Sequence, residues 1–102
     1  MASIGSTSIS VESGVSTPSI DYVNLTNAGT EYSYVIPQNA REYWFVNWGN
    51  SLVEYGYVAA GNKMPLNIKE AREKIKLTLN SPLTLYFKSI NAGGLIKIEY
   101  WT

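Results

Sequence analysis

Alternating polarity along the chain constrains its fold more than any other feature of the sequence. Residues 83–89 read Leu-Thr-Leu-Tyr-Phe-Lys-Ser and residues 95–102 read Leu-Ile-Lys-Ile-Glu-Tyr-Trp-Thr, with the connection Asn-Ala-Gly-Gly between them. Because successive side chains of a β-strand point to opposite faces, a period of two predicts strands that bury one face each. Two such runs with a short Gly-rich connection predict a hairpin at the end of the sequence.

The alternation continues through the whole sequence from residue 20 onward. Val23 and Leu25 face one way, and after turn residues at 27–29 the run 31–36 resumes the pattern, which predicts a first hairpin. Residues 63–74 are ambiguous: their apolar residues alternate as in an edge strand followed by a turn at 69–73, whereas Asn67 and Glu70, three apart, could cap a short helix. We favour the strand. The expected strands cover residues 20–26, 31–36, 42–48, 52–58, 63–68, 74–79, 83–89 and 95–102.

The run Glu42–Trp48 is the densest in aromatic and apolar residues. Tyr43 and Phe45 share one face, and Trp44, Val46 and Trp48 share the other. With both faces apolar, we expect a central strand covered on both sides.

Gly56 lies in the middle of the run 52–58. A glycine there indicates a bulge, a bend or the close approach of another backbone.

Seven or eight short strands with turn residues between them, and no convincing helix, are typical of an antiparallel sandwich or barrel. A length of 102 residues suits one domain with one core. We therefore expect an all-β fold, a single antiparallel β-sandwich that is jelly-roll-like or immunoglobulin-like, over residues 20–102.

Residues 1–19 form a Ser/Thr-rich segment that differs from the rest. It contains too little apolar surface to bury a core alone, so we expect an extended N-terminal arm, either mobile or laid as a strand on another surface. Its apolar residues Ile4, Ile9, Val11 and Val15 would then make the contacts.

Charge and residue content exclude several classes of function. Eight basic and eight acidic residues give a formal net charge of zero, so no global field favours nucleic acid or an anionic membrane. The sequence has no Cys and no His, which excludes disulfides, thiolate nucleophiles and metal sites built on sulfur or imidazole. We expect no metal and no cofactor. The start of the sequence lacks the basic and apolar regions of a secretory signal, so synthesis in a cytoplasm is the default.

Acid–base catalysis by paired carboxylates is the remaining enzymatic possibility. The candidate glutamates occupy outward positions of alternating runs, where a solvated charge is the ordinary choice. We therefore expect no enzyme. The candidates are Glu31, Glu42, Glu54 and Glu99.

Eight Tyr and three Trp make the sequence rich in aromatic residues. Such residues fill sandwich cores, form subunit interfaces, or stack against sugar rings. All three interpretations stay open for the aromatic candidates, which are Trp44, Trp48, Tyr55, Tyr57 and Trp101.

The end of the sequence resembles the closing strands of small structural proteins of tailed bacteriophages. Those proteins often end in a Leu-Tyr-Phe-x-Ser strand followed by an Ile- or Val-rich strand finishing in Glu-x-Trp, as residues 85–89 and 96–101 do here. The pattern extends over residues 30–102 and includes the run Tyr-Ser-Tyr-Val-Ile-Pro at 32–37. The resemblance implies a compact β-sandwich attached to a virion as a capsid-decorating, head-fibre or tail-associated component.

These observations give two hypotheses of different class. The first is a non-enzymatic virion protein, made in the host cytoplasm, that attaches to the major capsid protein or another virion protein and forms homo-oligomers. It would bind neither nucleic acid nor membrane. The second is a carbohydrate-binding module that uses surface Trp and Tyr side chains for host attachment, with a glycan as its ligand.

Overall fold

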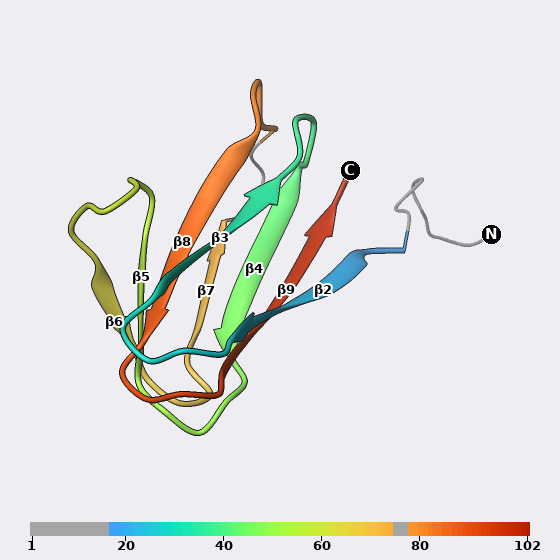
Figure 1. Cartoon of the computed structure of the whole chain (residues 1–102). Coiled ribbons are helices and arrows are strands. Elements are labelled where there is room, and N and C mark those ends of the chain that lie inside the picture. Colours follow the sequence, from blue (N-terminus) through green and yellow to red (C-terminus); the bar gives the residue numbers. More distant parts are fainter. Residues whose placement is uncertain (1–16, 75–77) are drawn as a thin grey trace, which may run out of the picture.

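The computed structural model describes residues 17–74 and 78–102, and these form eight β-strands (Figure 1). The strands make two four-stranded sheets in which every neighbouring pair is antiparallel. Sheet I has the order β2-β9-β4-β7 and sheet II the order β3-β8-β5-β6. Their bounds are β2 Ser19–Leu25, β3 Glu31–Ile36, β4 Glu42–Asn47, β5 Val53–Gly56, β6 Met64–Leu66, β7 Ala71–Lys74, β8 Leu83–Ser89 and β9 Gly94–Trp101.

The strand order identifies the fold as a jelly roll. Along the chain every connection except β5 to β6 crosses from one sheet to the other. An immunoglobulin-type sandwich would instead divide its strands as four and three with a different order. The predicted all-β sandwich is therefore confirmed, and of its two variants the jelly roll is the one formed.

Both predicted hairpins are wrong. Strands β8 and β9 alternate as expected, but β8 pairs with β3 and β5, while β9 pairs with β2 and β4. Strands β2 and β3 are likewise in different sheets. A connection of four or five residues can cross the ~10 Å between packed sheets. The alternation of polar and apolar residues is the same whether two consecutive strands pair as a hairpin or lie in different sheets.

The sandwich has two ends with different loops (Figure 1). The loops 26–30, 48–52, 67–70 and 90–93 gather at one end, which we call the lower end, and backbone hydrogen bonds join them to one another and to the strands. Trp48 N donates to the Leu95 carbonyl at 2.9 Å, and Ile90 N donates to the Leu52 carbonyl at 3.1 Å. Gly29 N donates to the Ser89 carbonyl at 2.9 Å. The lower end is thus closed by its own backbone.

Asn47, at the end of β4, is the buried polar side chain that holds the lower end together. Its Nδ2 donates to the carbonyl oxygens of Ser51 at 2.8 Å and Leu66 at 3.0 Å, and its Oδ1 accepts from Gly49 N at 3.1 Å. The side chain is fully buried, so these bonds replace the hydration that folding removes.

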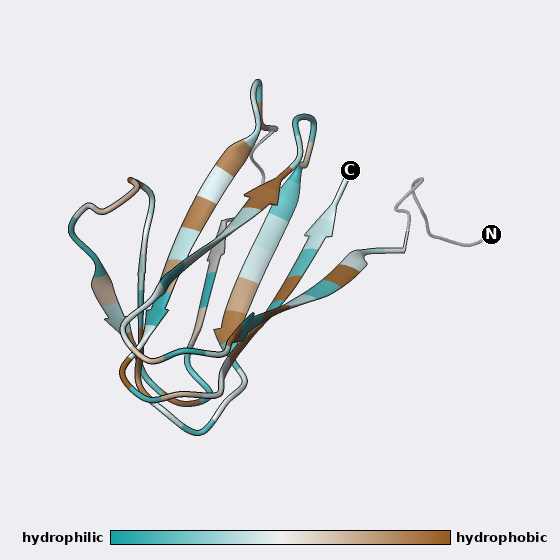
Figure 2. Ribbon diagram, in the orientation of Figure 1, coloured by the Kyte–Doolittle hydropathy of each residue, from teal (hydrophilic) through white to brown (hydrophobic). Residues whose placement is uncertain are grey.

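The core lies between the inward faces of the two sheets, and the alternating colours along β8 and β9 show the period of two (Figure 2). Phe45 from sheet I packs edge-on against Tyr55 and Phe87 from sheet II, with ring centroids 5.2 and 5.4 Å apart. The buried residues of this core are Val23, Leu25, Ile36, Ala40, Tyr43, Phe45, Val53, Tyr55, Leu66, Leu85, Phe87, Ile96 and Ile98.

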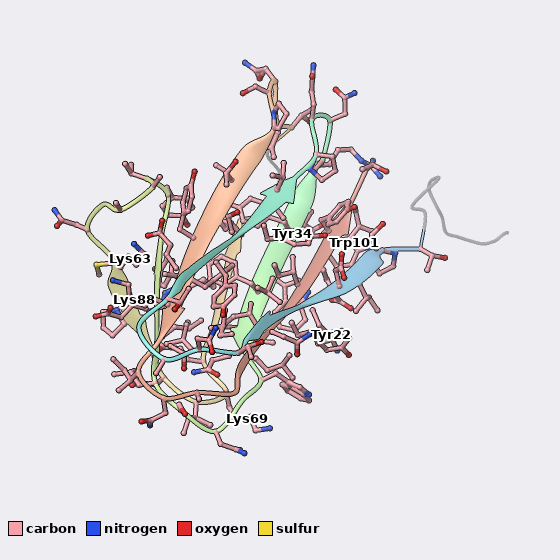
Figure 3. The ribbon with its side chains drawn as sticks, in the orientation of Figure 1. Tyr22, Tyr34, Lys63, Lys69, Lys88 and Trp101 are labelled. Carbon is pink, nitrogen blue, oxygen red and sulfur yellow. The ribbon has the colours of Figure 1, made fainter. Side chains whose placement is uncertain are left out.

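Toward the other end of the sandwich the core becomes tyrosine-rich. The Tyr34 hydroxyl, between the sheets, donates to Asp21 Oδ2 at 3.2 Å (Figure 3). Burial, with Asp21 and Tyr100 nearby, raises the pKa of Tyr34, and burial beside Tyr57 raises the pKa of Tyr43 to about 12. These hydroxyls therefore stay protonated at neutral pH.

The ambiguous segment 63–74 contains no helix. The edge strand is confirmed as β6, but the predicted turn at 69–73 is too long, because β7 already begins at Ala71. Asn67 and Glu70 do bond as a cap would, Asn67 N donating to Glu70 Oε1 at 2.8 Å, yet they close a tight turn. Of the predicted strand 74–79, residues 75–77 lie outside the described part, and Thr78 and Leu79 are not in a strand.

Gly56 ends β5 because another segment of backbone approaches it, which confirms one of the three possibilities. A Cβ at this position would lie 2.8 Å from the Asn62 carbonyl oxygen and 3.0 Å from Lys63 Cγ. The predicted strand 52–58 is thus shorter, and Tyr57 belongs to the loop that follows.

Candidate interaction surface

The register of sheet I places all three tryptophans on its outer face. Trp44 on β4 lies opposite Glu99 on β9, Glu42 lies opposite Trp101, and Trp48 follows β4 with the same parity. Strand β2 adds Ile20 and Tyr22 on the same side, opposite Glu99 and Lys97. We call this surface the tryptophan face. It comprises Ile20, Tyr22, Asn24, Glu42, Trp44, Val46, Trp48, Ala71, Glu73, Leu95, Lys97, Glu99 and Trp101.

Large apolar side chains remain accessible on the tryptophan face. Ile20, Tyr22 and Trp48 are 51, 49 and 46% exposed. The prediction that β4 is central is confirmed by its place between β9 and β7. The prediction that β4 is covered on both sides is wrong for the part of the chain that the structure describes. There, sheet II covers the inner face of β4, and neither sheet lies over its outer face. An uncovered apolar sheet face of this kind is typical of an interaction site.

Trp44 and Trp48 are held by charged neighbours. Trp44 Nε1 donates to Glu99 Oε1 across the β4–β9 pair. Lys69 Nζ lies over the Trp48 ring, 4.1 Å from its centroid, and Lys97 Nζ lies 5.5 Å from the same centroid. Both are cation–π contacts. The indole rings are therefore oriented in the free protein.

Lys69 adopts a backbone conformation that is unusual for its residue type. Its φ is 66°, in the left-handed region that glycine and asparagine enter most easily. It lies at the lower end, in the turn beside Trp48 (Figure 3). Backbone strain of this kind collects at functional positions. Asn39 and Ala60 also have a positive φ, and Lys69 is the residue of these three that contacts Trp48.

The outer face of sheet II is polar by comparison. Its rows are Glu54, Lys88 and Glu31, then Gly56, Tyr86 and Ser33. Lys63, from the loop after β5, reaches over this sheet and forms an ion pair with Glu31, whose carboxylate also accepts from Ala60 N at 3.0 Å (Figure 3). The loop 57–63 is thus fastened to the outside of sheet II, and the two outer faces differ in character.

The Glu31 ion pair predicts a pH dependence of stability. The hydrogen bond from Lys63, followed by that from Ala60, holds the pKa of Glu31 below its ordinary 4.5. A carboxyl with a lowered pKa in the folded state stabilises the fold above its unfolded pKa and loses that contribution as the pH falls through the folded pKa. Urea unfolding at pH 7, 5, 4 and 3 should therefore show stability falling below about pH 4.5, and less steeply in Glu31→Gln. Equal slopes would contradict the pairing.

The structure brings together three of the nine predicted interface residues, Trp44, Trp48 and Trp101. Tyr55 is not on a surface: it is only 7% exposed, packs against Phe45, and accepts a hydrogen bond from Arg72 Nε at 3.1 Å. Tyr57 is exposed but lies in the loop after β5, away from the tryptophan face. The remaining four, Ile4, Ile9, Val11 and Val15, lie outside the described residues.

Sequence reasoning missed the side chains that β2 and β9 add to the face. Ile20, Tyr22, Leu95 and Lys97 have the outward parity of their strands, which the alternation could have shown. No pattern in the sequence indicates that β9 pairs with β4 or that β2 lies beyond β9 in the same sheet. Strand order decides this, and it depends on long-range pairing.

The described residues hold no group of three or more His, Cys, Asp or Glu side chains that could bind a metal ion. The four candidate glutamates lie on the outer faces, two on each sheet, with Glu31 paired to Lys63 and Glu99 bound to Trp44. Within residues 17–74 and 78–102, no helix is long and apolar enough to span a bilayer.

Comparison with known proteins adds a fold neighbour. No family model matches the sequence, and no curated protein matches it. A de novo designed double-stranded β-helix, solved by solution NMR, superposes with a TM-score of 0.53 and 17% identity, covering 85% of this chain and 100% of the designed one. At that identity the likeness concerns the fold alone, and it agrees with the jelly-roll strand order.

Proposed function

We propose that this protein is a non-enzymatic structural component of a tailed-phage virion that acts through protein–protein contacts, including self-association. The observation that carries the proposal is the tryptophan face, an exposed sheet surface with three Trp side chains on one side of a sandwich whose other outer face is polar. Trp and Tyr are the residues most enriched where protein interfaces concentrate their binding energy.

Three further features support the proposal. Zero formal net charge places no general repulsion between copies. The jelly roll recurs in viral capsid proteins, which is an argument by analogy of fold. The resemblance of residues 30–102 to small phage structural proteins gives the class of particle.

A direct test is the composition of the particle. Virions made from the genome that encodes this chain, purified on a density gradient, should contain it in a fixed ratio to the major capsid protein, as measured by quantitative mass spectrometry. Detergent-free salt washes should leave the ratio unchanged. Particles that lack the protein would refute the proposal.

A glycan-binding role is the second candidate, because aligned Trp side chains on a flat sheet can stack against sugar rings. Two contacts oppose it: Lys69 already lies over the Trp48 ring, and the Trp44 N–H is bonded to Glu99. A glycan array would favour this role if it showed saturable binding lost in Trp48→Ala and kept in Tyr57→Ala, whose side chain is also exposed but off the face.

A further inference from the structure

The charges of the tryptophan face are divided along the strand direction. Lys97 and Lys69 lie in its lower half, with their ammonium groups at Trp48. Glu99 and Glu42 lie in its upper half, opposite Trp44 and Trp101. Arg41, next to Glu42, is turned to the Thr102 carbonyl oxygen. The register of β7 also places Glu73 opposite Trp44. Lys97 of the face and the adjacent Lys69 therefore put two positive charges at one end, and three acidic residues lie at the other.

The two lysines of the face differ from other basic residues of the described chain. Lys63 pairs with Glu31, Arg72 pairs with Glu70 at 2.8 Å, and Lys88 lies between Glu31 and Glu54 in the sheet register. Among the side chains that the structure describes, which do not include that of Glu73, Lys69 and Lys97 have no carboxylate within ion-pair distance. A surface that covers this face should therefore present carboxylates to its lower half.

A second copy of the same face meets that requirement. We propose that two copies pack together through their tryptophan faces and are related by a two-fold axis. The axis lies between the two faces, parallel to the sheets and perpendicular to the strands. The upper half of each face then covers the lower half of the other. The inference rests on the proposed function, since it names the partner and geometry of the self-association. Interfaces with this symmetry are self-complementary.

The strand register shows which residues of β2, β9 and β4 the rotation brings together, and on β7 the rotation sets Glu73 opposite Ala71. Each of the two central cross-strand rows of the face holds one residue from each of the four strands. The axis passes between these rows, which are Ile20, Glu99, Trp44 and Glu73, and Tyr22, Lys97, Val46 and Ala71. The rotation then sets Glu99 opposite Lys97 of the second copy. It also sets Ile20 opposite Tyr22, and Trp44 opposite Val46.

The rows on either side of these two central rows are also brought together by the rotation. Trp101 and Glu42 form one of them. Leu95 and Trp48, joined by a backbone hydrogen bond of 2.9 Å, lie in the other. The rotation sets Trp101 opposite Leu95, and it brings Glu42 to Trp48 and the Lys69 ammonium above it. Opposite charges meet, and large apolar side chains meet each other.

The other face-to-face arrangement, with the axis along the strands, is disfavoured by the same charges. In that arrangement each cross-strand row would face the same row of the second copy. The lysines of the two copies would then face each other in the lower half, and the glutamates would face each other in the upper half. Like charges in a desolvated interface oppose association.

Pairing through two of the four sheet edges, β2 and β6, is also less suitable. The Tyr22 N–H at the outer edge of β2 is already bonded to Asp21 Oδ1 at 3.0 Å, and an inward charge of this kind blocks strand addition. Strand β6, at one edge of sheet II, is three residues long and contains Pro65.

The size of the face sets the expected affinity. The four strands have 7, 8, 6 and 4 residues. At about 3.4 Å per residue and about 4.8 Å between strands they span on the order of 400 Å² per copy. Two copies would then bury on the order of 800 Å² together, which is the size of a weak complex. We expect a dimer with a dissociation constant in the micromolar range.

Charge reversal on the full-length chain tests the geometry. Sedimentation velocity from about 1 to 200 μM should show the wild type passing from monomer to dimer. Lys97→Glu should weaken the dimer at least about tenfold, because two-fold symmetry creates two glutamate–glutamate contacts, and Glu99→Lys should do the same with lysines. An equimolar mixture of the two variants should recover the dimer, since each reversed residue then faces its opposite.

Two controls keep the result specific. Thr84→Glu, on the outer face of sheet II, should leave the dimer unchanged. Circular dichroism should show that every variant keeps its β-sheet spectrum. A monomeric wild type at 200 μM, a dimer that survives Lys97→Glu, or a mixture that stays monomeric would overturn the inference. Presence of the protein in virions is measured independently, so a monomeric virion protein would overturn this inference alone.

Discussion

Phe45→Ala should lower the free energy of unfolding by about 3–5 kcal/mol, because it leaves a cavity between the two sheets. The ring is buried and makes edge-on contacts with Tyr55 and Phe87, at 5.2 and 5.4 Å between centroids. Such aromatic pairs add about 0.5–1.5 kcal/mol beyond the area they bury. Urea unfolding followed by Trp fluorescence would measure the loss.

Two matched variants separate the cavity from other effects. Phe45→Leu keeps most of the volume and should cost about 1–2 kcal/mol. Val35→Ala, which shortens an exposed apolar side chain on β3, should change stability by less than about 0.5 kcal/mol. If Phe45→Ala cost no more than Phe45→Leu, the ring would not be the contact that joins the sheets.

The buried face of each strand could be predicted from the sequence, whereas the neighbours of each strand could not. Val23, Phe45 and Phe87 all have the inward parity that alternation assigns to them. Alternation follows from the geometry of a single strand, so a local pattern is enough. The partner of a strand depends on how its connection runs. The short loop 90–93 is compatible with a hairpin, yet here it crosses between sheets.

The candidate surface could be predicted only within one strand. The shared outward parity of Trp44 and Trp48 is visible in the sequence, but the addition of Trp101 from 53 residues beyond Trp48 depends on the β4–β9 pairing. Tyr55 failed as a surface candidate for a related reason. Parity places it on one face of β5, and only the second sheet decides that this face is the core.

Local sequence patterns also failed to indicate the burial of Asn47. Asn47 ends a run of aromatic residues, and its polarity favours an exposed turn position. The structure buries it because the loop 48–52 and the last residue of β6, Leu66, present carbonyl groups to its amide. The lower end therefore depends on one amide that bonds to the loop 48–52 and to the end of β6, and its replacement should have a large effect.

Asn47→Asp should cost about 3–5 kcal/mol at neutral pH. It replaces an NH₂ group that donates to the carbonyl oxygens of Ser51 and Leu66 by a carboxylate oxygen that both would repel. Asn47→Ala removes the same bonds without adding a charge and should cost about 2–3 kcal/mol. Both losses are read from urea unfolding at pH 7.

The pH dependence of the two variants distinguishes lost hydrogen bonds from a buried charge. Burial against two carbonyl oxygens should raise the pKa of the new carboxyl above the value of about 3.9 it has in the unfolded chain. The folded state then binds the proton more tightly than the unfolded chain does. The stability of Asn47→Asp relative to Asn47→Ala is therefore greatest below the unfolded pKa and falls as the pH rises through the folded pKa. Protonation also restores one donor. Asn47→Asp should therefore approach or exceed Asn47→Ala in stability near pH 4 and fall below it at pH 7. Parallel pH profiles would mean that the side chain reaches solvent at this position, and the lower end of the sandwich would then be held by its backbone hydrogen bonds alone.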